Sequence, residues 1–354
     1  MHVAHLAEGL AAKGYDVTVL SQMYYNDPAP RSEVGPHGVR ILRFPDSTRS
    51  ARFPMALGLR THLRRYAGNY DVIHAHSFHA WPALVAANAA EKQFVFTPHY
   101  HGVGHTPAAR IAHLVYDPIA TRIFKRSASI ICVSEIEATR LADDYPFTHS
   151  STVVIPNGID MASIERAEPY DVDHPVVLTA GRLEDYKQID LVMAAMEHVG
   201  HDAELIVIGD GPVRRDLERI ARSAATRRPV RMTGRIEQHE LRNWQRTAAL
   251  TLCLSKEEAF GMVAAEGVAS GSRVVASDIP AHRELADQAA GRMRLVPVQI
   301  GPEALARVID AELESLEARR NAEDAGDAPF ADWNDVVAEV ELAYFPHLAT
   351  SPTP

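Results

Sequence analysis

The chain of 354 residues contains little cysteine, little lysine and no long apolar run. Its two cysteines, Cys132 and Cys253, lie inside apolar segments, so we expect core residues of a reduced, cytoplasmic protein and no disulfide framework. No run approaches 18 apolar residues, which argues against a membrane-spanning helix. The first ten residues lack a basic start followed by an apolar block, so no signal peptide is expected.

The charge is unevenly distributed along the chain. Residues 1–160 carry 15 Lys and Arg against 13 Asp and Glu, and 12 of the 18 histidines, whereas the remainder carries 21 against 33. Together with the length, this asymmetry indicates two domains with different partners. The acidic second half argues against nucleic acid as a ligand.

Both halves alternate β-branched apolar segments with helical ones, which predicts an α/β fold of two Rossmann-like, doubly wound parallel-sheet domains facing a cleft. Ligands of such sheets bind beyond the carboxyl ends of the strands, and here the crevice would lie between the domains. The predicted boundaries are a first domain over 1–159, a linker over 160–175, a second domain over 176–330, and a terminal helix with a tail over 331–354.

Small and cationic residues follow the first three predicted strands of the second half. They are Gly181, Arg182, Lys187, Gly209, Gly234 and Arg235. Glycine lets the backbone turn sharply, and cations beside free helix N–H groups suit a diphosphate. Ordinary strand–helix loops with solvated charges are the alternative interpretation.

Two carboxylates follow the fourth strand, Glu258 on the loop and Glu266 on a helix otherwise built of Ala, Gly and Val. A carboxylate accepts two hydroxyl hydrogen bonds at once, which suits a ribose or a hexose. A solvated helix face is the alternative. Gly261 between them would let backbone N–H groups approach a phosphate or sugar.

Two histidine clusters lie at strand ends of the first half. They are His74, His76 and His79, followed by His99, His101 and His105. Imidazoles at short spacing can bind Zn²⁺, but neither cluster contains an acidic or cysteine ligand, so we expect no metal site. His99, directly after a strand and Pro98, is better placed as a hydrogen-bonding residue facing the cleft.

Taken together, the motifs resemble the retaining GT-B glycosyltransferases of family 4, over nearly the whole chain. They occur in the family's order: PNGID (156–160), GRLEDYK (181–187), IGDGP (208–212), TGR (233–235) and EAFGMVAAEG (258–267). The final residues, 332–344, are similar to the family's closing helix, which crosses back onto the first domain. The resemblance implies an acceptor-side first domain and a nucleotide-sugar-binding second domain.

The resemblance also implies roles for single residues. Arg182 and Lys187 would neutralise the donor diphosphate, Glu266 would hold the nucleotide ribose, Glu258 would contact donor sugar hydroxyls, and His99 would lie beside the donor sugar. The backbone amides of Phe260, Gly261 and Met262 would lie near the sugar and phosphates, and Glu284 would support the domain.

The implied reaction is transfer of a sugar from a nucleoside diphosphate to a hydroxyl with retained configuration, without a cofactor or catalytic metal. The leaving diphosphate would take the acceptor's proton, which explains the need for cations, and no glycosidase-like pair of carboxylates is evident. The expected partners are a nucleotide sugar and a glycan or lipid-linked hydroxyl acceptor.

Two basic helical stretches suggest peripheral contact with an anionic membrane at its inner face, with solvated helix faces as the alternative. They contain Arg60, Arg64 and Arg65, and Arg122, Lys125 and Arg126.

One departure from the family pattern is at the start of the chain, which begins inside a helix over 2–13 where a strand and a Gly-Gly loop are expected first. This predicts an N-terminally shortened form of a longer enzyme. Two alternatives remain. One is a non-catalytic nucleotide-sugar-binding relative with an incomplete first domain. The other is a Rossmann oxidoreductase. The sequence argues against it, because Arg214 occupies the third glycine position of the dinucleotide fingerprint.

Overall fold

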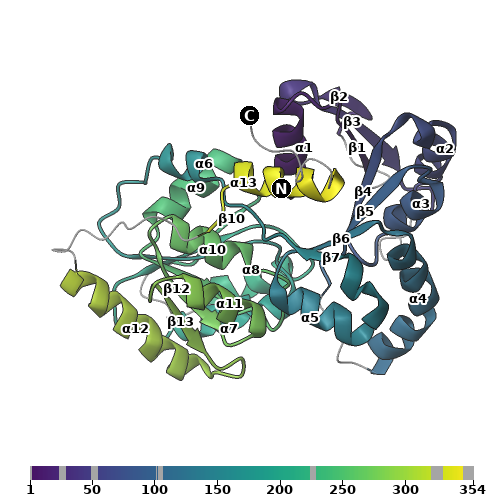
Figure 1. Ribbon diagram of the computed structural model, residues 1–354. Helices are drawn as coiled ribbons and strands as arrows, with labels where there is room; N and C mark the ends of the chain where they lie inside the picture. Colours follow the sequence, from purple (N-terminus) through teal and green to yellow (C-terminus); the bar gives the residue numbers. More distant parts are fainter. Residues whose placement is uncertain are drawn as a thin grey trace. The chain divides into compact units, whose positions relative to one another are not determined.

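The computed structural model describes residues 2–23, 29–48, 55–100, 102, 107–223, 229–319 and 330–345, with the side chains of 107–115 and 317–319 left out. The chain forms two compact units (Figure 1). Unit 1 contains Met1–Gly158 and Trp333–Pro354, and unit 2 contains Ile159–Asp332. Among the described residues, no helix combines the length and the apolar character needed to cross a bilayer.

Unit 1 holds the strands of two separate sheets. Its elements in chain order are α1 (His2–Ala12), β1 (Thr18–Met23), β2 (Ser32–Val34), η1 (Pro36–Gly38), β3 (Arg40–Pro45), α2 (Leu57–Tyr66), η2 (Ala67–Asn69), β4 (Val72–His76), α3 (Trp81–Ala89), β5 (Gln93–Thr97), α4 (Pro107–Arg126), β6 (Ser129–Cys132), α5 (Glu135–Asp144), η3 (Pro146–Ser151), β7 (Thr152–Val154) and α13 (Trp333–Tyr344). One sheet has the order β1-β3-β2 and the other the order β4-β5-β6-β7.

The first half therefore differs from the single parallel sheet that its sequence predicts. Strand β1 pairs in parallel with β3, while β2 pairs antiparallel with β3. Within the described ranges, no strand pairs with the remaining edge of β1 or of β4. The four strands β4 to β7 are parallel throughout, as expected.

Unit 2 is built around one six-stranded parallel sheet of order β10-β9-β8-β11-β12-β13. Its elements in chain order are α6 (Met161–Glu165), β8 (Val176–Ala180), η4 (Asp185–Lys187), α7 (Ile189–Met196), β9 (Glu204–Ile208), α8 (Arg214–Ser223), β10 (Arg231–Gly234), α9 (Gln238–Thr247), β11 (Leu250–Cys253), α10 (Met262–Ala269), β12 (Arg273–Ser277), α11 (Pro280–Gln288), β13 (Met293–Val296) and α12 (Pro302–Arg319).

Both faces of this sheet are covered, which explains why its strands are nearly continuous apolar runs. Leu205 and Val207 of β9 join a core that includes residues of α7 and α12, whereas Ile206 and Ile208 join Trp244 of α9 in a second core. Alternate side chains of one strand thus point to opposite faces. This arrangement leaves the strand ends as the place for polar side chains.

The segment 160–175, which the sequence predicts to be a linker, lies in unit 2 and begins with helix α6. Ile164 is buried, its carbonyl oxygen accepts from Arg246 of α9, and the ring of Tyr170 packs on Trp244. Helix α6 and the segment after it are therefore docked on α9, with Tyr170 packed against the core that contains Trp244.

Helix α13 belongs to unit 1, where it packs on α1. A Cβ on Gly9 of α1 would lie 2.5 Å from Cγ2 of Val337, so the two helices are in close contact. Glu341 of α13 pairs with Lys13 just after α1.

Candidate active site

Three loops meet at the carboxyl ends of the adjacent strands β8, β9 and β10. The N–H of Gly181 donates to the carbonyl oxygen of Ile208, and the N–H of Gly209 donates to that of Gly234, both at 2.9 Å. Gly209 has a φ of +136°, and a Cβ there would lie 1.8 Å from the carbonyl oxygen of Gly181. Glycine is required at this point because the loop backbones are in direct contact.

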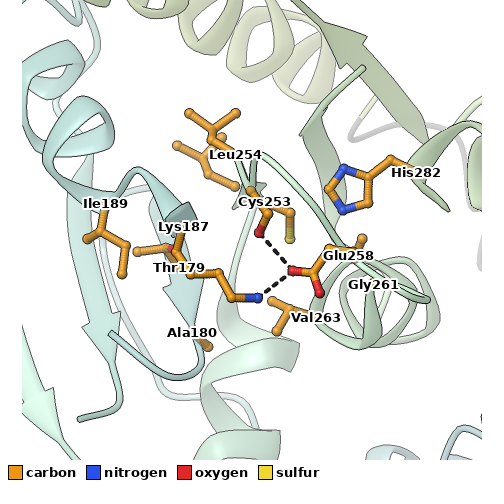
Figure 2. A pocket seen from close by; sticks show the side chains of 13 residues that line it. Thr179, Ala180, Lys187, Ile189, Cys253, Leu254, Glu258, Gly261, Val263 and His282 are labelled. Atoms are coloured by element: carbon orange, nitrogen blue, oxygen red, sulfur yellow. Dashed lines mark hydrogen bonds and ion pairs between the residues drawn. The ribbon is translucent and has the colours of Figure 1, made fainter. Parts of the chain in front are cut away.

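Lys187 and Glu258 meet in a small pocket at the carboxyl ends of β8 and β11 (Figure 2). Lys187 ends the short helix η4 after β8, and Glu258 lies on the loop after β11. The ammonium forms an ion pair with Oε1 of Glu258, and the hydroxyl of Ser255 donates to the same oxygen at 2.7 Å. The structure thus brings together two of the residues that the sequence predicts to bind a donor.

The electrostatics of the pocket keep Lys187 charged. Burial disfavours the ammonium, but the charge and hydrogen bond of Glu258 outweigh burial and raise the pKa of Lys187. Burial also raises the pKa of Cys253, which lines the same pocket, to about 12. The thiol therefore stays protonated at neutral pH and is not a nucleophile.

His282 is a pocket residue that the sequence interpretation missed. Its Nδ1–H donates to the carbonyl oxygen of Ser277 at 2.9 Å, so Nε2 carries the lone pair of the neutral ring. Nε2 is buried, and no described group bonds to it. Burial lowers the pKa of His282, which keeps this nitrogen an acceptor. The predicted Glu284 lies only two residues further along α11, so the motif AHRELA pointed to the right helix.

Gly261 forms the N-cap of α10 and adopts a φ of +100°. A Cβ there would lie 3.0 Å from Cδ2 of His282 and from Cδ1 of Leu285. The neighbouring Phe260 is buried and Met262 is half-buried. The close approach of this turn to α11 explains why the position holds glycine.

Glu266 lies inside unit 2, so the solvated-face alternative is wrong for this residue. Its Oε1 accepts from Nη2 of Arg242 at 3.0 Å and its Oε2 from Nε2 of Gln245 at 2.9 Å. Arg242 also donates to Oε1 of Gln245 at 2.7 Å. Each carboxylate oxygen retains a further lone pair that could accept a hydroxyl.

The remaining predicted donor residues of unit 2 are more exposed. The side chain of Arg182 is 67% exposed and its Nε lies 2.8 Å from Oε1 of Glu184. Arg235 is exposed, and Glu284, which is predicted to support the domain, is half-buried. The cationic loop side chains are thus accessible at the same edge of the sheet as Lys187.

His99 belongs to unit 1 and is held in a left-handed conformation with φ of 49°. The next residue, Tyr100, is fixed by Glu137, whose carboxylate accepts the N–H groups of Tyr100 and Val133. A backbone in this sparsely populated region persists only where its surroundings determine it, as these hydrogen bonds do here.

The two histidine clusters of the sequence do not assemble as such. His74 is hydrogen-bonded to Tyr344 and Thr97, and His79 packs on Phe78 and Tyr116. His101 and His105 lie outside the described residues.

Comparison with known proteins indicates the family to which the chain belongs. Residues 1–163 match Glycosyltransferase Family 4, and residues 160–328 match Glycosyl transferases group 1. The phosphatidyl-myo-inositol mannosyltransferase of Mycobacterium tuberculosis is 28% identical over 97% of this chain and 91% of that protein.

Solved structures support the same fold. The sucrose-phosphate synthase of Thermosynechococcus elongatus superposes with a TM-score of 0.78 at 21% identity, covering 99% of this chain and 93% of that chain. HepE from Anabaena, in complex with UDP and glucose, superposes with a TM-score of 0.66 at 15% identity, covering 94% and 99%. The chain has the GT-B fold of two Rossmann-like domains and belongs to the group 1, family 4 glycosyltransferases.

Proposed function

We propose that this glycosyltransferase moves a hexosyl group from a nucleoside diphosphate sugar to a hydroxyl acceptor, with retention of the anomeric configuration. The observation that carries the proposal is the Lys187–Glu258 pair in a pocket at the end of β8, where the glycine loop of that strand begins. A cation there would bind the diphosphate, and a carboxylate at the same point would accept hydrogen bonds from sugar hydroxyls.

Lys187 and the exposed Arg182 would stabilise the negative charge that develops on the leaving diphosphate. Since these side chains supply the positive charge, the proposed reaction needs no cofactor and no catalytic metal. Among the described residues that line the pocket, only Glu258 carries a carboxylate. A glycosidase-like mechanism with two flanking carboxylates is therefore less suitable than attack on the donor's own face, with the leaving diphosphate accepting the acceptor's proton.

Glu266 would bind the ribose of the nucleotide through the lone pairs that Arg242 and Gln245 leave open. The neutral Nε2 of His282 would accept a hydroxyl from the donor sugar. His99 of unit 1 would lie beside that sugar. Uracil is one candidate for the donor's base, because HepE was solved in complex with UDP.

The acceptor would be a glycan or a lipid-linked hydroxyl, reached at the inner face of an anionic membrane. Helix α2 supports this, because Arg60, Arg64 and Arg65 are exposed on it together with Leu57 and Tyr66. Such a surface combines charge attraction with apolar insertion. The second basic stretch contributes less, because Arg122 and Arg126 already bond to Asn88 and Ala90.

The test is an assay of nucleotide sugars with myo-inositol lipids and simple glycans, in the presence of a chelator. We expect one donor to be consumed, and NMR of the product to show the donor's anomeric configuration. Product of inverted configuration contradicts the proposed mechanism. Binding of a nucleotide sugar without transfer to any acceptor favours the non-catalytic alternative.

Membrane contact is tested separately by co-sedimentation with vesicles of phosphatidylglycerol. The triple variant Arg60→Gln, Arg64→Gln, Arg65→Gln should lose binding, whereas Arg215→Gln with Arg219→Gln on helix α8 of unit 2 serves as the control. Binding that is unaffected by the triple change contradicts the proposed contact.

A further inference from the structure

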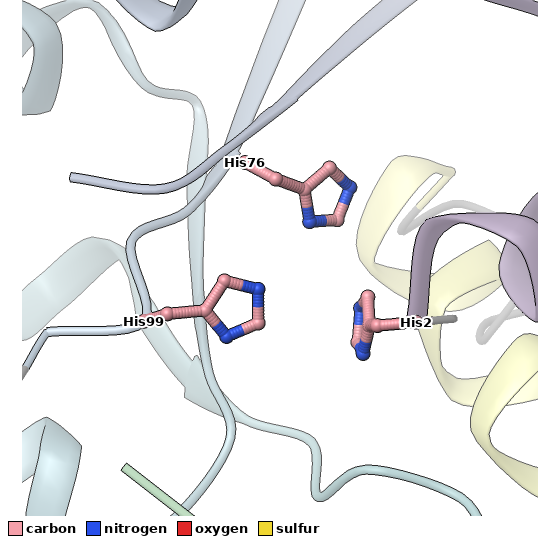
Figure 3. Close-up of side chains that lie close together, drawn as sticks. All are labelled: His2, His76 and His99. Atoms are coloured by element: carbon pink, nitrogen blue, oxygen red, sulfur yellow. The ribbon is translucent and has the colours of Figure 1, made fainter. Parts of the chain in front are cut away.

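Three histidines of unit 1 converge on one point (Figure 3). His2 comes from α1, His76 ends β4, and His99 follows β5. One ring nitrogen from each residue lies within 4.8 Å of the others. The ring centroids of His2 are 5.2 Å from those of both His76 and His99.

The fold explains why two of these residues meet. Strands β4 and β5 are parallel neighbours in which His76 pairs with Thr97, so His99 emerges beside His76 at the same end of the sheet. Helix α1 then places His2 opposite the two strand ends.

The hydrogen bonds of His2 and His76 leave one ring nitrogen of each able to bind a ligand. Nδ1 of His2 lies 2.6 Å from Oδ1 of Asn157, and an amide oxygen only accepts, so Nδ1 carries the proton and Nε2 the lone pair. Nδ1 of His76 is buried, and no described group bonds to it. Such an atom costs free energy unless a water or an ion binds it.

Burial keeps the imidazoles of His2 and His76 neutral. It lowers the pKa of His2 to about 4, against the hydrogen bond of Asn157, and lowers the pKa of His76 well below its usual value. Neutral imidazole is the form that binds a metal ion.

We propose that His2, His76 and His99 form a binding site for a divalent transition-metal cation of the zinc class. Imidazole nitrogens suit zinc, nickel and copper, and not magnesium or calcium. At Zn–N distances of 2.0–2.1 Å, the nitrogens of a tetrahedral site lie ~3.3 Å apart, so the rings must close by about 1.5 Å. Rotation about the broad χ2 torsion of histidine supplies such a movement.

The second layer of the site has the arrangement found in metalloproteins. Asn157 fixes the ring of His2, as outer hydrogen-bond acceptors orient metal-bound histidines. The ring of His74 lies against that of His76 at a tilt of 36°, with the ring centroids 4.2 Å apart, and its own nitrogens bond to Tyr344 and Thr97. Three ligands leave at least one coordination position open to water or an anion.

The site shares His99 with the proposed donor-sugar contact, so a bound cation would inhibit transfer. This consequence rests on the proposed function, whereas the site itself does not. Occupation would withdraw the imidazole from the sugar and add a positive charge beside it.

The experiment is calorimetric titration of the tag-free chain with ZnCl₂, after treatment with a chelator. We expect one equivalent to bind, and Co²⁺ in its place to give the visible d–d absorption of a four-coordinate site. The variants His2→Gln, His76→Gln and His99→Gln should each weaken binding at least tenfold, and Asn157→Ala by ~10–100-fold. His149→Gln, an exposed histidine of the same unit, is the matched control.

The proposal is overturned if the wild-type chain binds no zinc, or if His76→Gln binds as tightly as His149→Gln. Circular dichroism in chelator verifies that each variant is folded, and the wild-type titration is decisive even if one is not. Zinc binding by a chain without transfer activity would support the site and contradict the proposed function. Transfer that persists at saturating zinc would contradict the assignment of His99 to the donor sugar.

Discussion

Arg242 and Glu266 form an ion pair inside unit 2, with Nη2 and Oε1 3.0 Å apart and the two side chains 1% and 4% exposed. They connect helix α9 to helix α10. Gln245, one turn after Arg242, donates to the other oxygen of Glu266. The carboxylate that is expected to hold a ribose is thus positioned by a buried network.

We expect Arg242→Met to lower the free energy of unfolding by about 3–5 kcal/mol, because Glu266 would remain buried without its counter-charge. The double variant Arg242→Met, Glu266→Leu should lose clearly less, since it leaves no buried charge. Urea unfolding followed by circular dichroism measures both. Equal losses in the two variants would contradict the assignment of the loss to an uncompensated charge on Glu266.

The second prediction concerns Lys187. Lys187→Met should weaken binding of the nucleoside diphosphate by about 1.5–3 kcal/mol, or ~10–150-fold in Kd, since it removes a hydrogen bond to a charged group. Calorimetric titration with UDP and GDP measures the effect. Lys256→Met is the matched control, because Lys256 lies on the same loop as Glu258 but its side chain is 51% exposed. An equal loss in both variants would indicate a general charge effect and not a phosphate contact.

The sequence predicted most strands of unit 2, because buried parallel strands are nearly continuous apolar runs, as they are at β8, β9, β11 and β12. It did not predict β2 or β13. These strands are only three and four residues long, and each includes a charged side chain. Such short strands form through their neighbours in the sheet, and their own pattern is too brief to indicate them.

Site residues were predictable only where a motif carried them. Lys187 and Glu258 lie 71 residues apart, and only the shared edge of a parallel sheet joins them. The partner of Glu266 could not be predicted, because nothing in the helical pattern of α9 indicates that Arg242 points inward. The positions of the strands bring His76 of one predicted histidine cluster beside His99 of the other. His2 was missed because the direction of α1 depends on packing against α13.

The third prediction compares two glycines of unit 2. Gly209→Ala should destabilise the protein by more than about 3 kcal/mol, because the new Cβ would collide with the carbonyl oxygen of Gly181. Gly271→Ala, with φ of +87° and no atom within 4 Å of its Cβ, should cost only ~1–2 kcal/mol of backbone strain. Thermal unfolding distinguishes them. Equal losses would show that the loops of β8 and β9 can move apart.

The last prediction concerns the pH dependence of stability. Burial raises the pKa of Glu137 to about 7 from 4.5, although the N–H groups of Val133 and Tyr100 favour its charged form. Between these values the folded chain keeps a proton that the unfolded chain has released, so this residue's contribution to stability falls as the pH rises from 4.5 to 7.

Glu137→Gln removes that proton, and the difference in unfolding free energy between wild type and variant should therefore decrease by about 3 kcal/mol across this pH range. Histidines that titrate in the same range contribute equally to both proteins and cancel in the difference. Glu135→Gln, an exposed change on the same helix, should show no such trend. Urea unfolding at half-unit steps from pH 4.5 to 7.5 measures it. A difference that rises with pH would contradict this prediction. It would mean that Glu137 is charged in the folded state, because the hydrogen bonds from Val133 and Tyr100 outweigh the effect of burial.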